Sequence, residues 1–282
     1  MQGSVLIALL LTLLAGLATG LGGLGVLLSR KPSLRLLAFG LGFSAGVMVF
    51  VSLAELVPEA RELIGGAVGE GRGDWIAYAC FFGGILLSRL LDAAIPEPAE
   101  NPHEVVSAAD LELFALEMER DAQATGGLND GQRRSLARVG LLTALAIAIH
   151  NVPEGMATFV SAMADPSLGV SVAVAVAIHN IPEGISVAVL FFFATRSRAK
   201  AFAYSLASGL AEPVGALLVY LVLMPFIDDA VVGGMLAAVA GIMVFISFDE
   251  LLPMAREYGK GHLEITGVVL GMAVMAVSLS LL

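Results

Sequence analysis

The sequence has little charge and almost no cysteine. Of its 282 residues, 14% are charged and 58% are apolar, whereas soluble domains carry charge on about a quarter of their residues. The mean hydropathy is +0.90, so a soluble fold would expose large apolar patches, and soluble or disordered classes are excluded. The single Cys excludes a disulfide framework and a multi-cysteine zinc site. A net charge of −10 argues against nucleic-acid binding, which needs a basic surface.

What the sequence does have is a series of long apolar runs. Each is near the ~20 residues that a helix needs to cross the bilayer core, which predicts an all-α integral membrane protein surrounded by lipid. We expect a single transmembrane domain over 1–282 that is a bundle of eight transmembrane helices. Their predicted ranges are roughly 4–28, 36–58, 75–95, 138–163, 169–194, 199–225, 230–254 and 264–282.

The distribution of Lys and Arg predicts the orientation in the membrane. With the N-terminus outside, all of the 15 basic residues except Arg61 and Arg72 fall on the cytoplasmic side. Basic residues concentrate in cytoplasmic loops, so we expect both termini to be extracytoplasmic. The polar loop at about 96–137, between the third and fourth spans, is then cytoplasmic, and 104–123 within it predict an amphipathic helix.

A short motif occurs twice, in the middle of the fourth and fifth spans. His150-Asn151-Val152-Pro153-Glu154-Gly155 recurs as His179-Asn180-Ile181-Pro182-Glu183-Gly184. In each copy the His and Glu are four residues apart and share a helix face. The proline removes a backbone donor and frees a carbonyl, while the glycine lets another backbone approach closely.

A second motif also occurs twice, in the second and seventh spans. The segment 52–62, with Glu55 and Pro58, matches the segment 247–257, with Glu250 and Pro253. These spans are expected to run antiparallel, so one copy faces outside and the other faces the cytoplasm. The pattern predicts an inverted repeat of helices 1–3 and 6–8, with helices 4 and 5 between them in a 3+2+3 arrangement, as in many secondary transporters. A duplication kept only for packing is the alternative.

The duplicated His and Glu residues predict a metal site. An ionised carboxylate at the bilayer centre costs roughly 2.5–3.5 kcal/mol on insertion scales, and two neighbouring ones also repel. A divalent cation offsets both costs, and imidazole with carboxylate suits zinc and its first-row neighbours, whereas the absence of thiolate disfavours Cu(I). Six ligands could hold two ions, with Glu154 and Glu183 bridging them. The alternative is that the His and Glu side chains only pair with each other inside the bundle.

Other carboxylates lie within the predicted spans. Glu212, followed by Pro213, is near the middle of the sixth span and is a candidate further ligand. Four more carboxylates lie nearer the ends of their spans and are candidate stations at the mouths of a path: Glu55, Glu59, Asp249 and Glu250. Carboxylates near a helix end also reach the interface without any such role, and both readings stay open.

The two His-Asn-x-Pro-Glu-Gly motifs and the run Gly209-Leu-Ala-Glu-Pro-Val-Gly215 resemble the ZIP (Zrt/Irt-like) family of metal transporters, and bacterial members most closely. The resemblance covers the whole chain. It implies eight helices with both termini extracytoplasmic, a homodimer in the bacterial cytoplasmic (inner) membrane, and uptake of divalent metal. It also implies a binuclear centre, with a first site of His150, His179, Glu154 and Glu183. The second site would share both Glu residues and add Asn151, Asn180 and Glu212. Many members have a His-rich loop between helices three and four, whereas this loop contains only His103.

Three functions are consistent with these residues. The favoured one is a transporter that imports Zn²⁺, with Fe²⁺, Mn²⁺, Co²⁺ and Cd²⁺ as further substrates and no catalytic cofactor. The second is an intramembrane di-metal enzyme, although the sequence has no His-Glu-x-x-His arrangement with a spare Glu base. The third, a receptor or scaffold with a structural metal, leaves the repeated prolines unexplained. The sequence does not select the preferred metal or the coupling mechanism.

Overall fold

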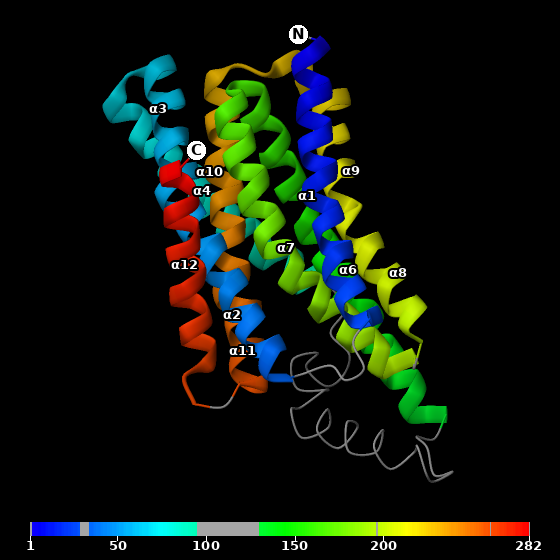
Figure 1. Ribbon diagram of the computed structural model, residues 1–282. Helices are drawn as coiled ribbons and strands as arrows, with labels where there is room; N and C mark the ends of the chain where they lie inside the picture. The colour runs from blue at the N-terminus through cyan, green and yellow to red at the C-terminus, as the bar shows by residue number, and fades with distance from the viewer. Residues whose placement is uncertain (1, 29–33, 95–129, 196, 260, 282) are drawn as a thin grey trace.

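The computed structural model describes residues 2–28, 34–94, 130–195, 197–259 and 261–281, and the regular structure in these ranges is helical. The helices lie alongside one another in an elongated bundle (Figure 1). Seven helical stretches in the described ranges are long and apolar enough to cross a membrane, and they correspond to seven of the predicted spans. The predicted fourth span, 138–163, lies within α6. The predicted helix at 104–123 and His103 lie outside the described residues.

The spans differ in how regular they are. Five are single helices: α1 (Gln2–Leu28), α4 (Glu70–Ala94), α6 (Asp130–Ala164), α7 (Pro166–Thr195) and α12 (Leu263–Leu281). The second span is α2 (Leu34–Val51), η1 (Ser52–Leu56) and α3 (Val57–Val68). The sixth is α8 (Arg198–Gly209), α9 (Ala211–Leu218), η2 (Val219–Leu223) and η3 (Met224–Phe226), and the seventh is α10 (Asp229–Ile246), η4 (Ser247–Leu251) and α11 (Leu252–Tyr258).

The second span extends to Val68 rather than ending near Pro58 as predicted. The cause is η1, a five-residue π-helical turn in which the Val57 N–H donates to the Ser52 carbonyl five residues back. Pro58 then falls in the first turn of α3, where a missing N–H is tolerated. Because of the π-turn, the helical span continues beyond Pro58 instead of ending there.

The seventh span has the same local structure. In the π-turn η4 the Leu252 N–H donates to the Ser247 carbonyl, and Pro253 falls in the first turn of α11. The two copies of the 52–62 and 247–257 motif thus share their backbone conformation as well as their sequence. π-turns inside α-helices are rare and occur frequently at functional sites.

The helices form two groups that meet along α6 and α7 (Figure 1). The first group, which we call the central group, contains α6 and α7 packed against α1, α8 and α9. The second, the lateral group, contains α2, α3, α4, α10, α11 and α12, with α2 against α12 and α4 against α10. Contacts of α2 with α7 and of α10 with α6 join the groups.

The polarity of the bundle is that of a protein in lipid. Large apolar side chains cover the outside, including Leu14, Phe82 and Leu221, which are 63%, 65% and 70% exposed. Carboxylate, imidazole and amide side chains are instead buried between α6, α7 and α9. Charged groups inside a membrane bundle mark functional sites by default, so these buried groups define the candidate site.

Candidate metal centre

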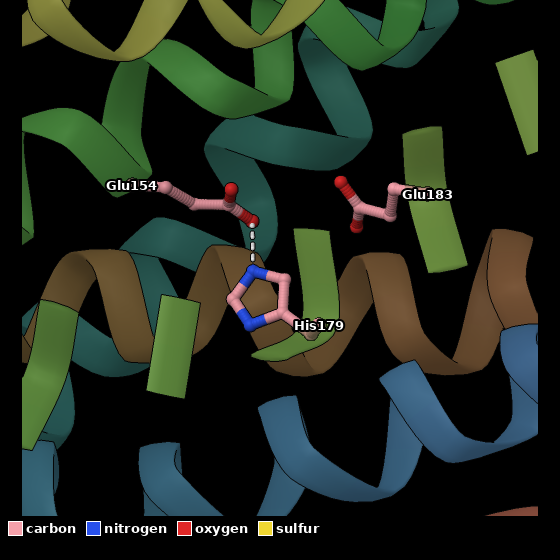
Figure 2. A group of neighbouring side chains, drawn as sticks. All are labelled: Glu154, His179 and Glu183. Atoms are coloured by element: carbon pink, nitrogen blue, oxygen red, sulfur yellow. Dashed lines mark ion pairs between the residues drawn. The ribbon is translucent and has the colours of Figure 1, made fainter. Parts of the chain in front are cut away.

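Three buried side chains form the central cluster: Glu154 of α6, and His179 and Glu183 of α7. One possible ligand atom from each lies within 4.8 Å of the other two. Figure 2 shows the Glu154 carboxylate against the imidazole and the Glu183 carboxylate directed toward the same space. His179 Nε2 is 3.4 Å from Glu154 Oε1. Two carboxylates and one imidazole are a ligand set that suits zinc and its first-row neighbours.

Polar atoms of this cluster have no hydrogen-bond partner in the described residues. They include the second oxygen of Glu154 and both ring nitrogens of His179, and these side chains are 1% and 0% exposed. An unsatisfied buried polar atom costs about 1–3 kcal/mol, more for a charged group. A cation bound to these atoms would offset that cost, so the donor set fits a metal ion.

The two motif asparagines are held in equivalent ways. The Asn151 amide N–H donates to the Ser208 carbonyl at 3.0 Å, and the Asn180 amide N–H donates to the Ala15 carbonyl at 2.9 Å. Both side chains are fully buried, and neither Oδ1 atom has a hydrogen-bond partner in the part of the chain that the structure describes. Anchoring the amide nitrogen fixes the oxygen, which is the atom that can bind a metal.

Glu212 lies beside Asn180. It is fully buried in the first turn of α9 and accepts a hydrogen bond from the Asn180 amide, while its other oxygen has no partner among the described residues. It can approach the motifs because α6 and α9 pack closely: a Cβ on Gly155 would overlap the Glu212 carbonyl oxygen. Gly155 is therefore required by close backbone approach, as predicted.

His150 does not join the central cluster. It is buried on α6, but its Nε2 lies 3.3 Å from Oε1 of Glu250 in the π-turn η4. The structure thus divides the ligand set that the resemblance implies for the first site: it brings Glu154, His179 and Glu183 together and places His150 against the lateral group. The motif sequence alone could not reveal this, because both copies carry His, Asn and Glu at the same positions.

The four candidate mouth carboxylates have different environments. Glu55 and Glu59 are partly exposed in η1 and α3, and Asp249 is exposed. The Glu250 side chain is only 13% exposed. Sequence reasoning also missed one neighbour of the cluster: the Ser44 hydroxyl of α2 donates to the His179 carbonyl at 3.3 Å.

Comparison with known proteins bears directly on this arrangement. Residues 3–279 match the family model described as ZIP zinc transporter. The chain is 51% identical over 280 residues to the zinc transporter ZupT of Clostridium perfringens, covering 99% of this chain and 97% of the relative. It is 51% identical to the zinc transporter ZupT of Lysinibacillus sphaericus over the full length of both chains. The zinc transporter ZupT of Streptococcus mutans is 48% identical, over 97% of each chain.

Proposed function

The chain belongs to the ZIP family of zinc transporters, and from this premise we propose that it imports Zn²⁺ into the bacterial cytoplasm through the central cluster. The observation that carries this proposal is the convergence of Glu154, His179 and Glu183 within 4.8 Å inside the bundle. The two carboxylates can balance the charge of a divalent ion and so offset the cost of removing its hydration shell. Fe²⁺, Mn²⁺, Co²⁺ and Cd²⁺ are further substrates, because imidazole and carboxylate ligands also bind divalent metals other than zinc.

The metal is the cargo, and the family membership makes the chain a transporter rather than a di-metal enzyme. The first ion binds Glu154, His179 and Glu183, and His150 becomes a fourth ligand when it leaves Glu250. The second ion shares the two Glu residues. Its remaining ligands are the anchored amide oxygens and the second carboxylate oxygen of Glu212, which are Asn151 Oδ1, Asn180 Oδ1 and Glu212 Oε2. No described residue supplies a hydrogen-bond partner to any of these three atoms, which supports the binuclear arrangement.

The path on either side of the cluster is proposed to be built from the inverted repeat of helices 1–3 and 6–8. The shared π-turn conformation of 52–56 and 247–251 supports it. So do equivalent contacts of the two motifs: Asn151 binds a carbonyl of α8, whereas Asn180 binds a carbonyl of α1. The motif glycines add a third pair, since a Cβ on Gly184 would overlap the Thr19 carbonyl of α1, just as Gly155 meets Glu212 of α9.

This likeness gives the repeat a residue register. The segment 15–22 aligns with 208–215, so Thr19 corresponds to Glu212 and Gly22 corresponds to Gly215. A Cβ at Gly22 would overlap the Ile181 carbonyl, and one at Gly215 would overlap the Val152 carbonyl, which are corresponding motif positions. The central pair α6 and α7 is then flanked by α1 and by α8–α9 in opposite orientations.

The membrane arrangement follows from the same proposal. The protein is a multi-pass bacterial membrane protein, which we place in the cytoplasmic (inner) membrane. Both ends of the chain lie toward the same end of the bundle as α3 (Figure 1), and the bias of Lys and Arg assigns that end to the outside. A homodimer is proposed from the family resemblance.

Metal flux tests the function directly. Purified protein in liposomes loaded with a zinc-sensitive dye should take up Zn²⁺, and empty liposomes should not. The double variant Glu154→Ala with Glu183→Ala serves as the matched control, because it removes both cluster carboxylates. A parent protein that binds zinc without moving it would leave only the receptor or scaffold reading.

A further inference from the structure

The contact between His150 and Glu250 joins the two groups of helices. His150 belongs to α6 in the central group, and Glu250 belongs to η4 in the lateral group. The other candidate ligands lie in the central group with His150. A displacement of one group along the other would therefore break this contact, whereas Glu154 of α6 and Glu183 of α7 would stay together in the central group.

The inverted repeat supplies a corresponding pair on the other side. Glu55 in η1 has the position in its π-turn that Glu250 has in η4, and His179 has the position in its motif that His150 has. The helices also pair correspondingly, because α10 meets α6 and α2 meets α7. Yet Glu55 is only partly buried, with no hydrogen bond or ion pair to any described residue. His179 contacts Glu154 instead.

The part of the bundle nearest the outer end of α6 is closed. Thr158 and Ser161, which follow Glu154 toward that end, are fully buried. Their hydroxyls lack a hydrogen-bond partner among the described residues. Buried polar groups are normally hydrogen-bonded, so a conformation that hydrates this region would satisfy them.

We propose that Glu55 is the outer counterpart of Glu250: when the central group moves to open the site to the outside, His179 leaves Glu154 and contacts Glu55, and His150 releases Glu250. The two glutamates then act as alternate latches, each holding one histidine of the repeated motif in one of the two states. This inference rests on the proposed transport function and on its inverted repeat. Glu55 is a positioning residue here, because it acts on the equilibrium between the states through His179.

Thiol labelling of position 161 tests the two latches. The protein, with Cys80→Ser and Ser161→Cys, is placed in nanodiscs without metal and exposed to a water-soluble thiol reagent that reaches both faces. Glu250→Gln should make Cys labelling severalfold faster, because it removes the latch of the state described here. Glu55→Gln should make labelling severalfold slower, because it removes the latch of the outward state. Glu62→Gln, which changes an exposed carboxylate on α3, is the matched control and should leave the rate unchanged.

The opposite signs separate the latch from a merely structural role, since general loosening would raise labelling in both variants. Equal signs, or no effect of Glu55→Gln in a parent that transports zinc, would overturn the inference and leave the proposed function standing. A parent protein that transports no zinc would contradict both the inference and the proposed function.

Cross-linking gives a second readout that does not depend on rates. A protease site is inserted into the 96–137 loop of the Cys80→Ser protein, so that positions 55 and 179 fall on different fragments. With Glu55→Cys and His179→Cys, a short bifunctional thiol reagent should hold the fragments together after cleavage. Leu53→Cys with His179→Cys is the control, because the Leu53 side chain in the same π-turn is 52% exposed. Joining in the control pair but not in the test pair would contradict the proposal.

Discussion

The two copies of the His-Asn-x-Pro-Glu-Gly motif have the same chemistry but different surroundings. Their backbones are held alike. In each copy the asparagine donates to a backbone carbonyl of a neighbouring helix, and the glycine packs against a second backbone carbonyl. Their histidines diverge, because His179 faces Glu154 inside the central group whereas His150 faces Glu250 across the boundary. The repeated sequence therefore determines the backbone contacts of this site, whereas the neighbouring helices determine which partner each histidine contacts.

The largest effect is expected where the two copies act together. Glu154→Ala or Glu183→Ala should each reduce zinc uptake to the level of empty liposomes, because each carboxylate comes from a different copy and both face one cluster. Circular dichroism and size-exclusion profiles should match the parent, which separates lost binding from lost folding. Normal zinc uptake by either single variant would show that the two motif copies do not share a site.

The histidines should be less equivalent. His179→Ala should weaken zinc binding by more than the roughly 10–100-fold typical of residues that only support a ligand, because its imidazole lies in the cluster. His150→Ala should stay within that range, because His150 must leave Glu250 before it can bind metal. Isothermal titration calorimetry with Zn²⁺ measures both. Equal losses would mean that the two histidines hold the ion alike.

The next contrast lies between corresponding positions of α9 and α1. Glu212→Gln should lower the zinc bound from about two ions per chain to about one, with reduced rather than absent uptake, because the second site loses its own carboxylate. Thr19→Ala removes only a hydroxyl at the corresponding place and should leave the stoichiometry unchanged. Metal analysis after gel filtration gives the ratio. Two tightly held ions in Glu212→Gln would remove this residue from the ligand set.

The smallest contrast is expected in the packing. Gly155→Ala and Gly184→Ala each place a methyl group against a carbonyl of a neighbouring helix, and overpacking typically costs about 1–3 kcal/mol. Since the backbones are held alike, the two variants should lose similar amounts of thermal stability, measured by tryptophan fluorescence of Trp75. A loss confined to one copy would contradict the equivalence of the scaffolds.

Much of the fold could be predicted from the sequence because it depends on composition and length. Apolar runs of membrane length fix the spans, and their predicted ranges agree with the helices to within a few residues at most ends. The end of the second span was wrong, since a proline normally stops a helix and the π-turn before Pro58 has no simple sequence signature. The division into central and lateral groups was not predicted, because it depends on which helix faces pack together.

The candidate site could be predicted only as a set of residue types. Repetition of His, Asn and Glu at one depth pointed to a set of buried residues, of which Glu154, His179 and Glu183 converge and His150 does not. The carbonyls of Ala15 and Ser208, which orient the asparagines, were missed because a backbone oxygen leaves no mark in the sequence. The separation of His150 from His179 was missed because both motif copies carry the same candidate ligands, whereas Glu250, which contacts His150, belongs to a different span.

The most direct test of the central cluster is to locate the metal itself. Crystals of the zinc-loaded protein, measured at the zinc absorption edge, should give an anomalous peak at bonding distance, about 2.0–2.2 Å, from Glu154, His179 and Glu183. A peak in the parent that disappears in the Glu154→Ala and Glu183→Ala variants would establish that both motif copies hold one ion. Anomalous density confined to Glu55, Glu59 or Asp249, with none between α6 and α7, would contradict the account.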